Sequence, residues 1–450
     1  MSIEDSVLGF VMAGGNGNRL KLLTKDRCKP DLEIIGRYRI FDFVASNIIN
    51  TGLPVSLVAT QFKPESLCAH IKKTWEKNRS DTKFEIINPN EEGSSIARFE
   101  GTADSVRKSI DIISKYDPEI ILVLAADHIY FMNYKDAIMQ HKMNNADITI
   151  MANVIPDSKV KDFGILKIDD SGRIVDFAEK PTDQDVIDSF RLAPWIKNRL
   201  CIEEPNMNFL ASMGNYIFNW DRLKKFLDFP GVDFGKDIIP TIKDNGGLLY
   251  AYIFNGYWRD VGKIRDYFDC NMEFASKPRS LLESWIGIHE ELLHPPQIDS
   301  SSSIRRTVLS SGNVISQKNS IVDSVLGKCV VIEEGCKLHH CILLGADTNC
   351  NIQANIVESA IRIGKGSCLN KVIFDRNVWV GENVHIDPHN GTPEKRKKIL
   401  QSIGLKPYRK VEDGEIEGDF YIEPETGILI IGKQQDADPK EPILPNGLRC

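Results

Sequence analysis

The 450-residue sequence lacks several features that would place it in common functional classes. It has no run of about 18 apolar residues, so we expect no transmembrane helix. Its start, MSIEDSVLGF, has neither the basic region nor the long apolar region of a signal peptide, so we expect a cytoplasmic protein. No stretch interleaves basic and aromatic residues, and the formal net charge is -7, which argues against nucleic-acid binding.

The ten cysteines include no Cys-x-x-Cys pair. We therefore expect reduced, buried thiols rather than a disulfide scaffold or a zinc site. The one cluster that resembles a metal site is Cys336, His339, His340 and Cys341. We expect no metal there, because these residues fall within a repeat whose turns place small and polar residues side by side.

A glycine-rich turn follows the first apolar run of the chain. The run at residues 7–12 has the continuity of a strand buried on both faces, and Gly14, Gly15 and Gly17 follow it. Glycines at this place let backbone N–H groups approach an anion. The spacing is not that of a dinucleotide-binding GxGxxG loop, and no Gly-Lys-Ser/Thr of a Walker A loop follows.

Two cations follow the glycines, ten positions apart, at Arg19 and Lys29. Glycines after a strand are a weak signal by themselves, because any tight turn favours them. Together with the two cations they predict a loop that binds a triphosphate.

Further sequence blocks follow in a fixed order over about the first 270 residues. They are GGNGNRL and Lys29-Pro30, GRYRIFDFVASNIINTG at 36–52, TQF at 60–62, FEGTADSV at 99–106, AADHIY at 125–130, FGI at 163–165, FAEKP at 177–181, ASMGNYIF at 211–218, DFGKDIIP at 233–240 and YWRDVGKI at 257–264. In this order they resemble the bacterial ADP-glucose pyrophosphorylases (glucose-1-phosphate adenylyltransferases).

The resemblance implies a reaction in which an oxygen of glucose 1-phosphate attacks the α-phosphorus of ATP. Pyrophosphate leaves, ADP-glucose forms for glycogen synthesis, and no covalent enzyme intermediate is required. Catalysis is then positioning plus charge neutralisation, with Mg²⁺ as the cofactor. The family also implies a homotetramer and a phosphorylated metabolite as effector.

The resemblance also implies the site residues. Catalysis would use Arg19 on the leaving phosphates, Lys29 at the reacting phosphorus, and Asp127. The nucleotide would meet Gly14, Gly15, Gly17, Arg19, Gln61, Gly101 and Thr102. Glucose 1-phosphate would meet Phe99, Gly164, Glu179, Lys180 and Ser212, with Lys180 on its phosphate. Asp127 and Asp260 would bind Mg²⁺, although Asp260 could instead form a salt bridge with Arg259.

Strand and helix patterns alternate in the first part of the chain. Residues 55–59 and 120–126 are predicted strands, and an amphipathic helix is predicted over 102–116. This alternation predicts a parallel α/β sheet, with Asp127 just past the carboxyl end of a strand, where such sheets bind ligands. The charged stretch 182–208 is predicted to be an irregular surface excursion.

The second part of the chain shows a period of six. Leu326, Ile332, Leu338, Leu344, Cys350 and Ile356 are spaced by six residues, as are Val372, Val378 and Val384, while Arg362 and Gly366 interrupt the pattern. Hexapeptide repeats predict a left-handed parallel β-helix with the aliphatic residue pointing inward. We therefore predict a Rossmann-like nucleotidyltransferase domain at 1–275, a Pro- and Ser-rich linker at 276–310, and a left-handed β-helix domain with a C-terminal cap at 311–450.

The sequence departs from the family at an acidic stretch beside the cations. Asp31 and Glu33 lie where the family has a small apolar stretch, and Asp26 lies where many members carry a cation. These acids predict weak activation by a phosphorylated effector. They also leave open a non-catalytic regulatory subunit, while a nucleotidylyltransferase that uses UTP, dTTP or GTP remains a further alternative.

Overall fold

The computed structural model describes residues 6–15, 17–76, 81–91, 94, 96–277, 280–286, 294–346, 361–411, 415–434 and 442–450. They form two compact units. One contains Met1–Gly15 and Phe41–Trp258, and the other contains Asn16–Ile40 and Arg259–Cys450. These units differ from the predicted domains, because residues 16–40 group with the second half of the chain. No helix in the described part of the chain is long and apolar enough to cross a membrane.

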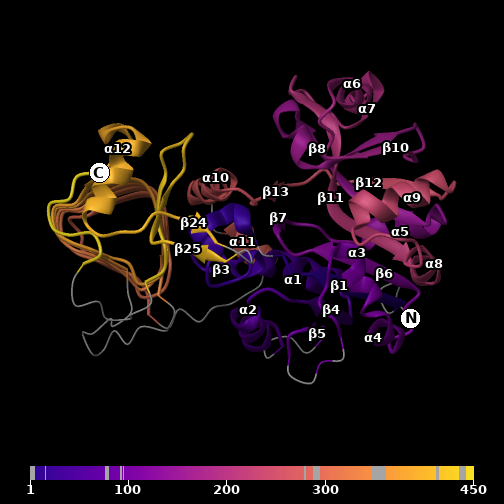
Figure 1. Cartoon of the computed structure of the whole chain (residues 1–450), viewed down its shortest axis with the longest axis horizontal. Helices are drawn as coiled ribbons and strands as arrows, with labels where there is room; N and C mark the ends of the chain where they lie inside the picture. The colour runs from indigo at the N-terminus through magenta and orange to yellow at the C-terminus, as the bar shows by residue number, and fades with distance from the viewer. Residues whose placement is uncertain are drawn as a thin grey trace. The chain divides into compact units, whose positions relative to one another are not determined.

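The first unit is built on a nine-stranded sheet whose main path runs β10-β9-β11-β6-β1-β4-β5 (Figure 1). Its strands are β1 (Val7–Met12), β4 (Val55–Ala59), β5 (Lys83–Ile87), β6 (Ile120–Ala125), β8 (Ile148–Pro156), β9 (Gly164–Ile168), β10 (Ile174–Glu179), β11 (Met207–Asn219) and β12 (Leu249–Ile253). β1 pairs in parallel with β4 and β6, and β4 with β5, which confirms the predicted parallel core. β11 runs antiparallel to β6.

Helices and one short strand complete this unit. They are α1 (Ile40–Thr51, which begins in the second unit), α2 (Glu65–His70), η4 (Ile71–Glu76), α3 (Thr102–Arg107), α4 (Ile110–Ser114), β7 (His128–Tyr130), α5 (Lys135–Met143), η5 (Asp157–Asp162), α6 (Gln184–Ser189), α7 (Pro194–Arg199), α8 (Trp220–Phe226), η6 (Phe234–Ile238) and α9 (Ile239–Asp244). The buried core includes Phe10, Val123 and Phe218 from the sheet.

Two local predictions for this unit are wrong. The helix predicted over 102–116 is two helices, α3 and α4, separated at Lys108 and Ser109. The stretch 182–208 is not irregular, because it contains α6 and α7. Ile187 and Phe190 are buried against Phe209. The sequence did not reveal these helices, because many charged residues surround the few apolar positions.

The second unit contains a parallel β-helix, the orange and yellow stack in Figure 1. One sheet has the order β14-β16-β18-β20-β22, formed by β14 (Gln297–Ile298), β16 (Val314–Ile315), β18 (Val330–Ile332), β20 (Ile361–Ile363) and β22 (Trp379–Val380). The other has the order β15-β17-β19-β21-β27-β26, formed by β15 (Ser303–Leu309), β17 (Ser320–Lys328), β19 (Lys337–Gly345), β21 (Cys368–Phe374), β27 (Leu429–Ile431) and β26 (Phe420–Ile422), and β23 (His385–Ile386) pairs with β21. β14 and β15 fall in the range predicted as a linker.

One coil of the β-helix is 17 residues, not 18. Ser303 pairs with Ser320, and Ser320 with Lys337. Three corners turn each coil through residues with positive φ, at 306, 312 and 318 in one coil and at 323, 329 and 335 in the next. The spacings of six, six and five explain why a strict period of six drifts out of phase.

The drift decides which aliphatic residues reach the core. Leu326, Ile332 and Leu338 are core residues as predicted, and so are the three valines from Val372 to Val384. Leu343 enters the core in place of the predicted Leu344, because Leu343 is the partner of Leu326 one coil earlier. Cys350 and Ile356 lie outside the described residues.

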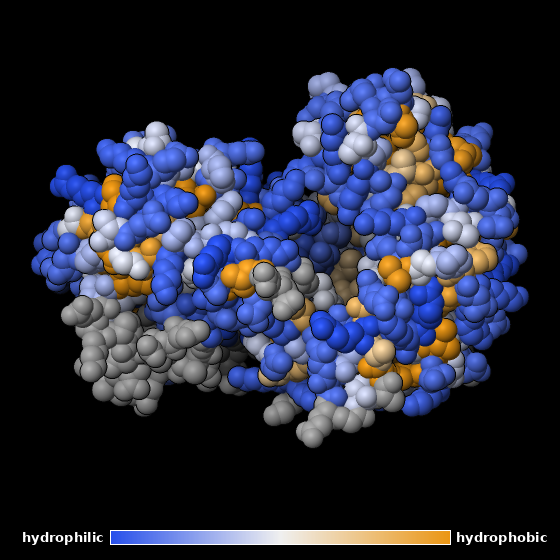
Figure 2. Space-filling view, viewed as in Figure 1, coloured by the Kyte–Doolittle hydropathy of each residue, from blue (hydrophilic) through white to orange (hydrophobic). Residues whose placement is uncertain are grey.

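The remaining elements of this unit flank the β-helix. They are η2 (Asn18–Thr24), η3 (Lys29–Asp31), β2 (Glu33–Ile34), β3 (Tyr38–Arg39), β13 (Trp258–Asp260, which begins in the first unit), α10 (Ile264–Ala275), α11 (Ser280–Ile286), η8 (Pro388–Asn390), α12 (Pro393–Ser402), β24 (Arg409–Lys410) and β25 (Ile416–Glu417). Leu400 of α12 packs into the β-helix core. The face shown in Figure 2 is mostly hydrophilic, with hydrophobic residues in small groups.

Candidate active site

Three of the predicted site residues, Arg19, Lys29 and Asp260, come together in the second unit. Lys29 Nζ lies 2.9 Å from Asp260 Oδ1, and Arg19 Nη2 lies 3.9 Å from Asp260 Oδ2. The Lys29 side chain is only 6% exposed, whereas that of Arg19 is 57% exposed. The carboxylate therefore holds the lysine in place, and the arginine keeps a solvent-facing guanidinium that an anionic ligand can reach.

Gly17 fixes the turn that brings these cations together. Its φ is 63°, and a Cβ atom there would lie 2.9 Å from Thr24 Cγ2 and 3.0 Å from Lys29 Cβ. Thr24 Oγ1 donates a hydrogen bond to the Gly17 carbonyl at 3.1 Å. A larger residue would be strained and would push Lys29 away, so the glycine is needed here.

Arg259, the alternative partner that the sequence offered for Asp260, pairs with a different carboxylate. Arg259 Nη1 lies 3.1 Å from Glu273 Oε2 on α10, while Asp260 pairs with Lys29. Asp260, a predicted metal ligand, is thus bonded to Lys29, a predicted catalytic residue. The sequence did not predict this contact.

The acidic stretch next to Lys29 is neutralised by neighbouring arginines. Asp31 forms an ion pair with Arg39. Glu33 forms ion pairs with Arg27, at 2.7 Å, and with Arg376. Asp31 and Glu33 therefore do not add unbalanced negative charge beside Lys29.

In the first unit, Gln61 connects two of the predicted nucleotide-binding segments. It follows β4, and its side chain would touch a Cβ atom at Gly14, at 3.5 Å. Gln61 Nε2 donates to the Phe99 carbonyl at 3.1 Å, and the Phe99 N–H donates to Gln61 Oε1 at 2.5 Å. The amide thus fixes the backbone before Gly101. Gly15 has open space beside its Cα, so the strand end is accessible there.

Thr102 begins α3 and is tied to a second turn. Its hydroxyl donates to Asp233 Oδ2 at 3.1 Å and accepts from the Phe234 N–H at 2.9 Å. Asp233 in turn caps η6 by accepting from Gly235 N–H and Lys236 N–H. Gly101 has no room for a side chain, because a Cβ atom there would lie 2.3 Å from the Val232 carbonyl oxygen.

Glu179 and Lys180 form the centre of the predicted sugar-phosphate site. They lie at the end of β10, where Glu179 is the register partner of Gly164 on β9. A Cβ atom at Gly164 would lie 2.5 Å from Glu179 Oε2, so the glycine makes room for this carboxylate. Lys180 Nζ lies 3.5 Å from Glu179 Oε1, and its side chain is 55% exposed.

Burial raises the pKa of Glu179, and the nearby Asp233 raises it further, while Lys180 opposes both. A partly desolvated carboxylate of this kind is a strong acceptor for hydroxyl groups. Ser212, also predicted to contact the sugar, is buried on β11 and accepts a hydrogen bond from Gly214 N–H at 3.2 Å.

Asp127 lies just past the carboxyl end of β6, as predicted. Its side chain is 38% exposed, and its Oδ1 lies 3.4 Å from His128 Nε2. His128 Nδ1 lies 3.1 Å from the Met213 carbonyl oxygen, and its ring packs edge-on against Trp258. The imidazole is therefore held in place beside an accessible carboxylate.

The cysteine–histidine cluster of the β-helix, where the sequence predicts no metal, contains two buried thiols and two histidines near Asp323. Cys336 and Cys341 are buried, and their thiols lie 3.2 Å from the Gly364 carbonyl and 3.3 Å from the Leu369 carbonyl. His339 points outward toward Asp323, 3.6 Å away, but Arg306 already bonds both oxygens of that carboxylate. Cys329 is disulfide-bonded, so the expectation of reduced thiols throughout is wrong at this position.

Known proteins match this chain over most of its length. The family described as Nucleotidyl transferase matches residues 8–277, and the GLGC left-handed parallel beta-helix domain matches residues 292–403. Glucose-1-phosphate adenylyltransferase of Acetivibrio thermocellus is 33% identical, over 89% of this chain and 88% of its own. The chain belongs to the glucose-1-phosphate adenylyltransferase family.

Other members of this family show similar likeness. The Clostridium novyi glucose-1-phosphate adenylyltransferase is 39% identical over 62% of this chain and 69% of its own. The small subunit from Triticum aestivum, named chloroplastic/amyloplastic, is 32% identical over 85% of this chain and 84% of its own. The comparison confirms the resemblance and the fold class, including the left-handed β-helix.

Sequence reasoning about the glucose-1-phosphate adenylyltransferase family missed several residues of the site. Asp233 and His128 lie within the blocks DFGKDIIP and AADHIY, but neither was given a role. An Asp directly before the first apolar residue of a helix is an N-cap signal, and it could have identified Asp233. No sequence signal points to Asp375 or Arg376, whose contacts with residues 16–40 depend on the folded β-helix.

Proposed function

We propose that this chain transfers the adenylyl group of ATP to α-D-glucose 1-phosphate, giving ADP-glucose and pyrophosphate for glycogen biosynthesis. The observation that carries the proposal is the buried pair of Lys29 with Asp260, with Arg19 beside it behind a glycine-rich turn. A held ammonium and an accessible guanidinium suit a reaction whose transition state spreads negative charge over phosphate oxygens.

In this proposal Arg19 binds the leaving phosphates and Lys29 stabilises charge at the α-phosphorus. The backbone at Gly14, Gly15 and Gly17 meets the triphosphate. Gln61, Gly101 and Thr102 shape the nucleotide site through the contacts that fix the Phe99 backbone and the start of α3.

Glucose 1-phosphate is proposed to bind at the end of β10. Lys180 is exposed and suits the terminal phosphate, while Glu179 accepts hydrogen bonds from sugar hydroxyls. Gly164, Ser212 and Phe99 complete this group. These roles separate binding of the sugar phosphate from charge stabilisation at the reacting phosphorus, and mutant kinetics can test the separation.

Nucleotidyltransferases of this family generally use a divalent metal ion. The residues here fit such an ion, because Asp127 and Asp260 each offer carboxylate oxygens, which Mg²⁺ prefers over nitrogen and sulfur donors. We propose that both are Mg²⁺ ligands. When bound, the ion would neutralise phosphate charge, while Lys29 holds the Asp260 carboxylate in its orientation.

Pyrophosphate release by the purified chain tests the function. We expect turnover with ATP, glucose 1-phosphate and Mg²⁺, and slower turnover with UTP, dTTP and GTP. Preference for another triphosphate would replace the adenylyl assignment. Turnover only after addition of a second subunit would favour the regulatory-subunit alternative.

We further propose a cytoplasmic homotetramer, on the basis of the family. A phosphorylated metabolite remains the proposed class of effector. Glu33 already occupies two arginines, Arg27 and Arg376, so these two are not open to a phosphorylated ligand unless Glu33 moves.

A further inference from the structure

Residues 18–39 form a segment that carries Arg19 and Lys29 and lies against the β-helix side of the second unit. We call it the cation segment. It contains η2, η3, β2 and β3, and β24 and β25 are drawn beside its indigo trace in Figure 1. η2 contacts β25 and β26, so the C-terminal cap of the β-helix reaches this segment directly.

Near the start of the cation segment, Lys21 contacts two tyrosines of the cap. Lys21 Nζ lies 5.0 Å from the centre of the Tyr408 ring and 5.6 Å from that of Tyr421. Lys25 Nζ also donates to the Gly418 carbonyl at 3.3 Å. The two rings pack edge to face with their centres 5.5 Å apart, and Lys21 contacts both, so this contact restrains the residues that flank Arg19.

The middle of the cation segment is held by a buried ion pair. Arg27 is 3% exposed, and its Nη2 bonds both oxygens of Asp375, which is 1% exposed and follows β21. Glu33 connects the same Arg27 to Arg376. The Arg27 guanidinium is thus held through Nη2 by Asp375 and through Nη1 by Glu33, and Arg27 is only two residues from Lys29.

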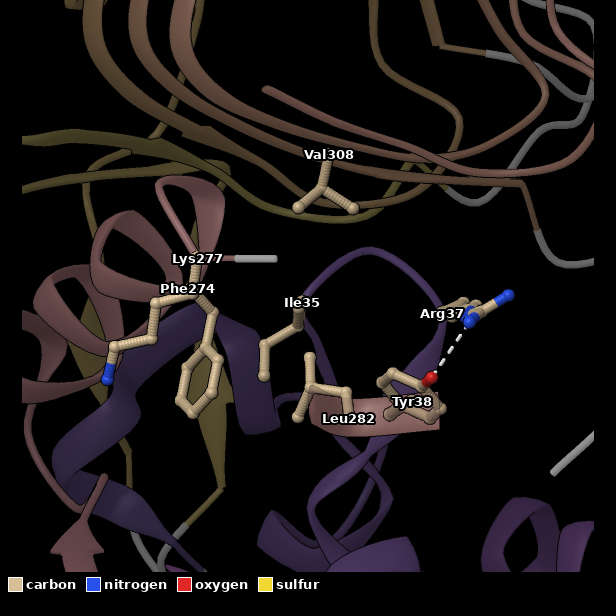
Figure 3. Close-up of a pocket in the computed structure, with 7 residues that line it drawn as sticks. All are labelled: Ile35, Arg37, Tyr38, Phe274, Lys277, Leu282 and Val308. Atoms are coloured by element: carbon tan, nitrogen blue, oxygen red, sulfur yellow. Dashed lines mark hydrogen bonds between the residues drawn. The ribbon is translucent and has the colours of Figure 1, made fainter. Parts of the chain in front are cut away.

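The end of the segment is held through its backbone and by apolar packing. Tyr267 donates from its hydroxyl to the Glu33 carbonyl at 2.6 Å, and the Ile35 N–H donates to Asn271 Oδ1 at 2.8 Å. Figure 3 shows Ile35 beside Phe274 and Leu282, around a hollow with Val308 on its other side. The hollow has room for about one water molecule, so it is packing space and not a ligand site.

These contacts share one consequence. The segment that carries both proposed phosphate-binding cations is anchored by α10, by Asp375 and Arg376, and by Tyr408, Gly418 and Tyr421 of the cap, none of which is a proposed catalytic group. We propose that Asp375, Tyr408 and Tyr421 are positioning residues: they act through Arg27 and Lys21 to set the places of Lys29 and Arg19. The inference rests on the proposed function for what the cations do.

Two variant pairs test it, each with a matched control. Tyr408→Leu removes one of the two aromatic rings that contact Lys21, and Tyr408→Phe keeps that ring. Asp375→Asn weakens the buried pair, and Asp323→Asn weakens the more exposed Arg306–Asp323 pair of the same β-helix. The measurements are hydrogen exchange of residues 18–34, the Kd of a non-reacting ATP analogue, and steady-state kinetics for ATP and glucose 1-phosphate.

We expect Asp375→Asn and Tyr408→Leu to speed exchange in the segment and to weaken binding of the ATP analogue about tenfold or more. The KM for ATP should rise and kcat should fall, while the KM for glucose 1-phosphate stays within about twofold, because Lys180 and Glu179 belong to the first unit. Tyr408→Phe and Asp323→Asn should behave as wild type.

General loss of folded enzyme would lower the maximal rate without changing either KM, so the kinetic split distinguishes positioning from stability. Unchanged exchange in both variants, or faster exchange with unchanged analogue affinity, would overturn the inference. A wild-type chain that binds the analogue but makes no ADP-glucose would refute the proposed function alone, since exchange and analogue affinity still report on the anchoring.

Discussion

Replacement of Lys29 by methionine tests the central contact of the site. Lys29 is nearly buried and lies 2.9 Å from Asp260, so the methionine would fill its space but remove the ammonium, while Arg19 stays 3.9 Å from the carboxylate. Loss of one well-placed donor to a developing charge costs about 3–4 kcal/mol in the transition state. We therefore expect kcat/KM for ATP to fall by roughly 10²–10³-fold.

The free energy of unfolding should change less than the activation free energy. Breaking a fully buried ion pair costs about 3–5 kcal/mol, but Asp260 keeps some exposure and a second cation, so we expect about 1–3 kcal/mol. Denaturant unfolding of Lys29→Met, Asp260→Asn and the double variant forms a cycle. The double variant should lose at least about 1 kcal/mol less stability than the two single variants together.

Lys142→Met is the control for this cycle. Lys142 pairs with Glu119 at 2.8 Å on the surface, where such pairs contribute about 0–1 kcal/mol. Its activity should equal that of wild type. The argument for Lys29 fails if Lys29→Met keeps more than about a tenth of wild-type kcat/KM while its folded fraction is unchanged.

Three further predictions concern roles, pH and regulation. Asp127→Asn should lower kcat by about a hundredfold or more, whereas Lys180→Ala should chiefly raise the KM for glucose 1-phosphate; equal loss of kcat in both at constant KM would contradict this division. Burial lowers the pKa of His141 to about 4, below the ordinary 6.5, so the unfolded chain takes up the proton first. Stability is then complete above pH 6.5 and declines by up to about 3 kcal/mol as pH falls toward 4, and His141→Gln should flatten this decline in unfolding curves. Fructose 1,6-bisphosphate should stimulate the rate less than about tenfold, because Glu33 occupies two of the arginines; larger stimulation in rate assays would show that other cations form an effector site.

Much of the first unit could be predicted from the sequence because its strands are continuous apolar runs. Val55–Ala59 matches β4 at both ends, and Asp127 follows β6 as expected. The break between α3 and α4 could not be predicted, because residues 102–116 keep an apolar side throughout. The helices at 184–199 were missed since their few buried residues are surrounded by charge.

The β-helix was predicted from the six-residue period, but the 17-residue length of its coil was not predicted. Three corners spaced by six, six and five residues give a coil of 17, and the one-residue deficit is invisible in a short run of leucines and isoleucines. Contacts such as Arg27 with Asp375 join residues far apart in the chain. No local pattern encodes such a pair, so the anchoring of the cation segment required the structure.

The 17-residue coil also limits how this half of the chain can change in length. Deleting one residue within a flat side would exchange inward and outward positions up to the next corner. Beyond that corner, every side chain would lose its stacked neighbour in the adjacent coil. Whole coils can be added or removed, and so can loops that leave and rejoin at one point. Val331 pairs with Arg362, a step of 31, which is one coil plus 14 residues. Alignments of this region should therefore place gaps at corners and keep the stacked positions in register.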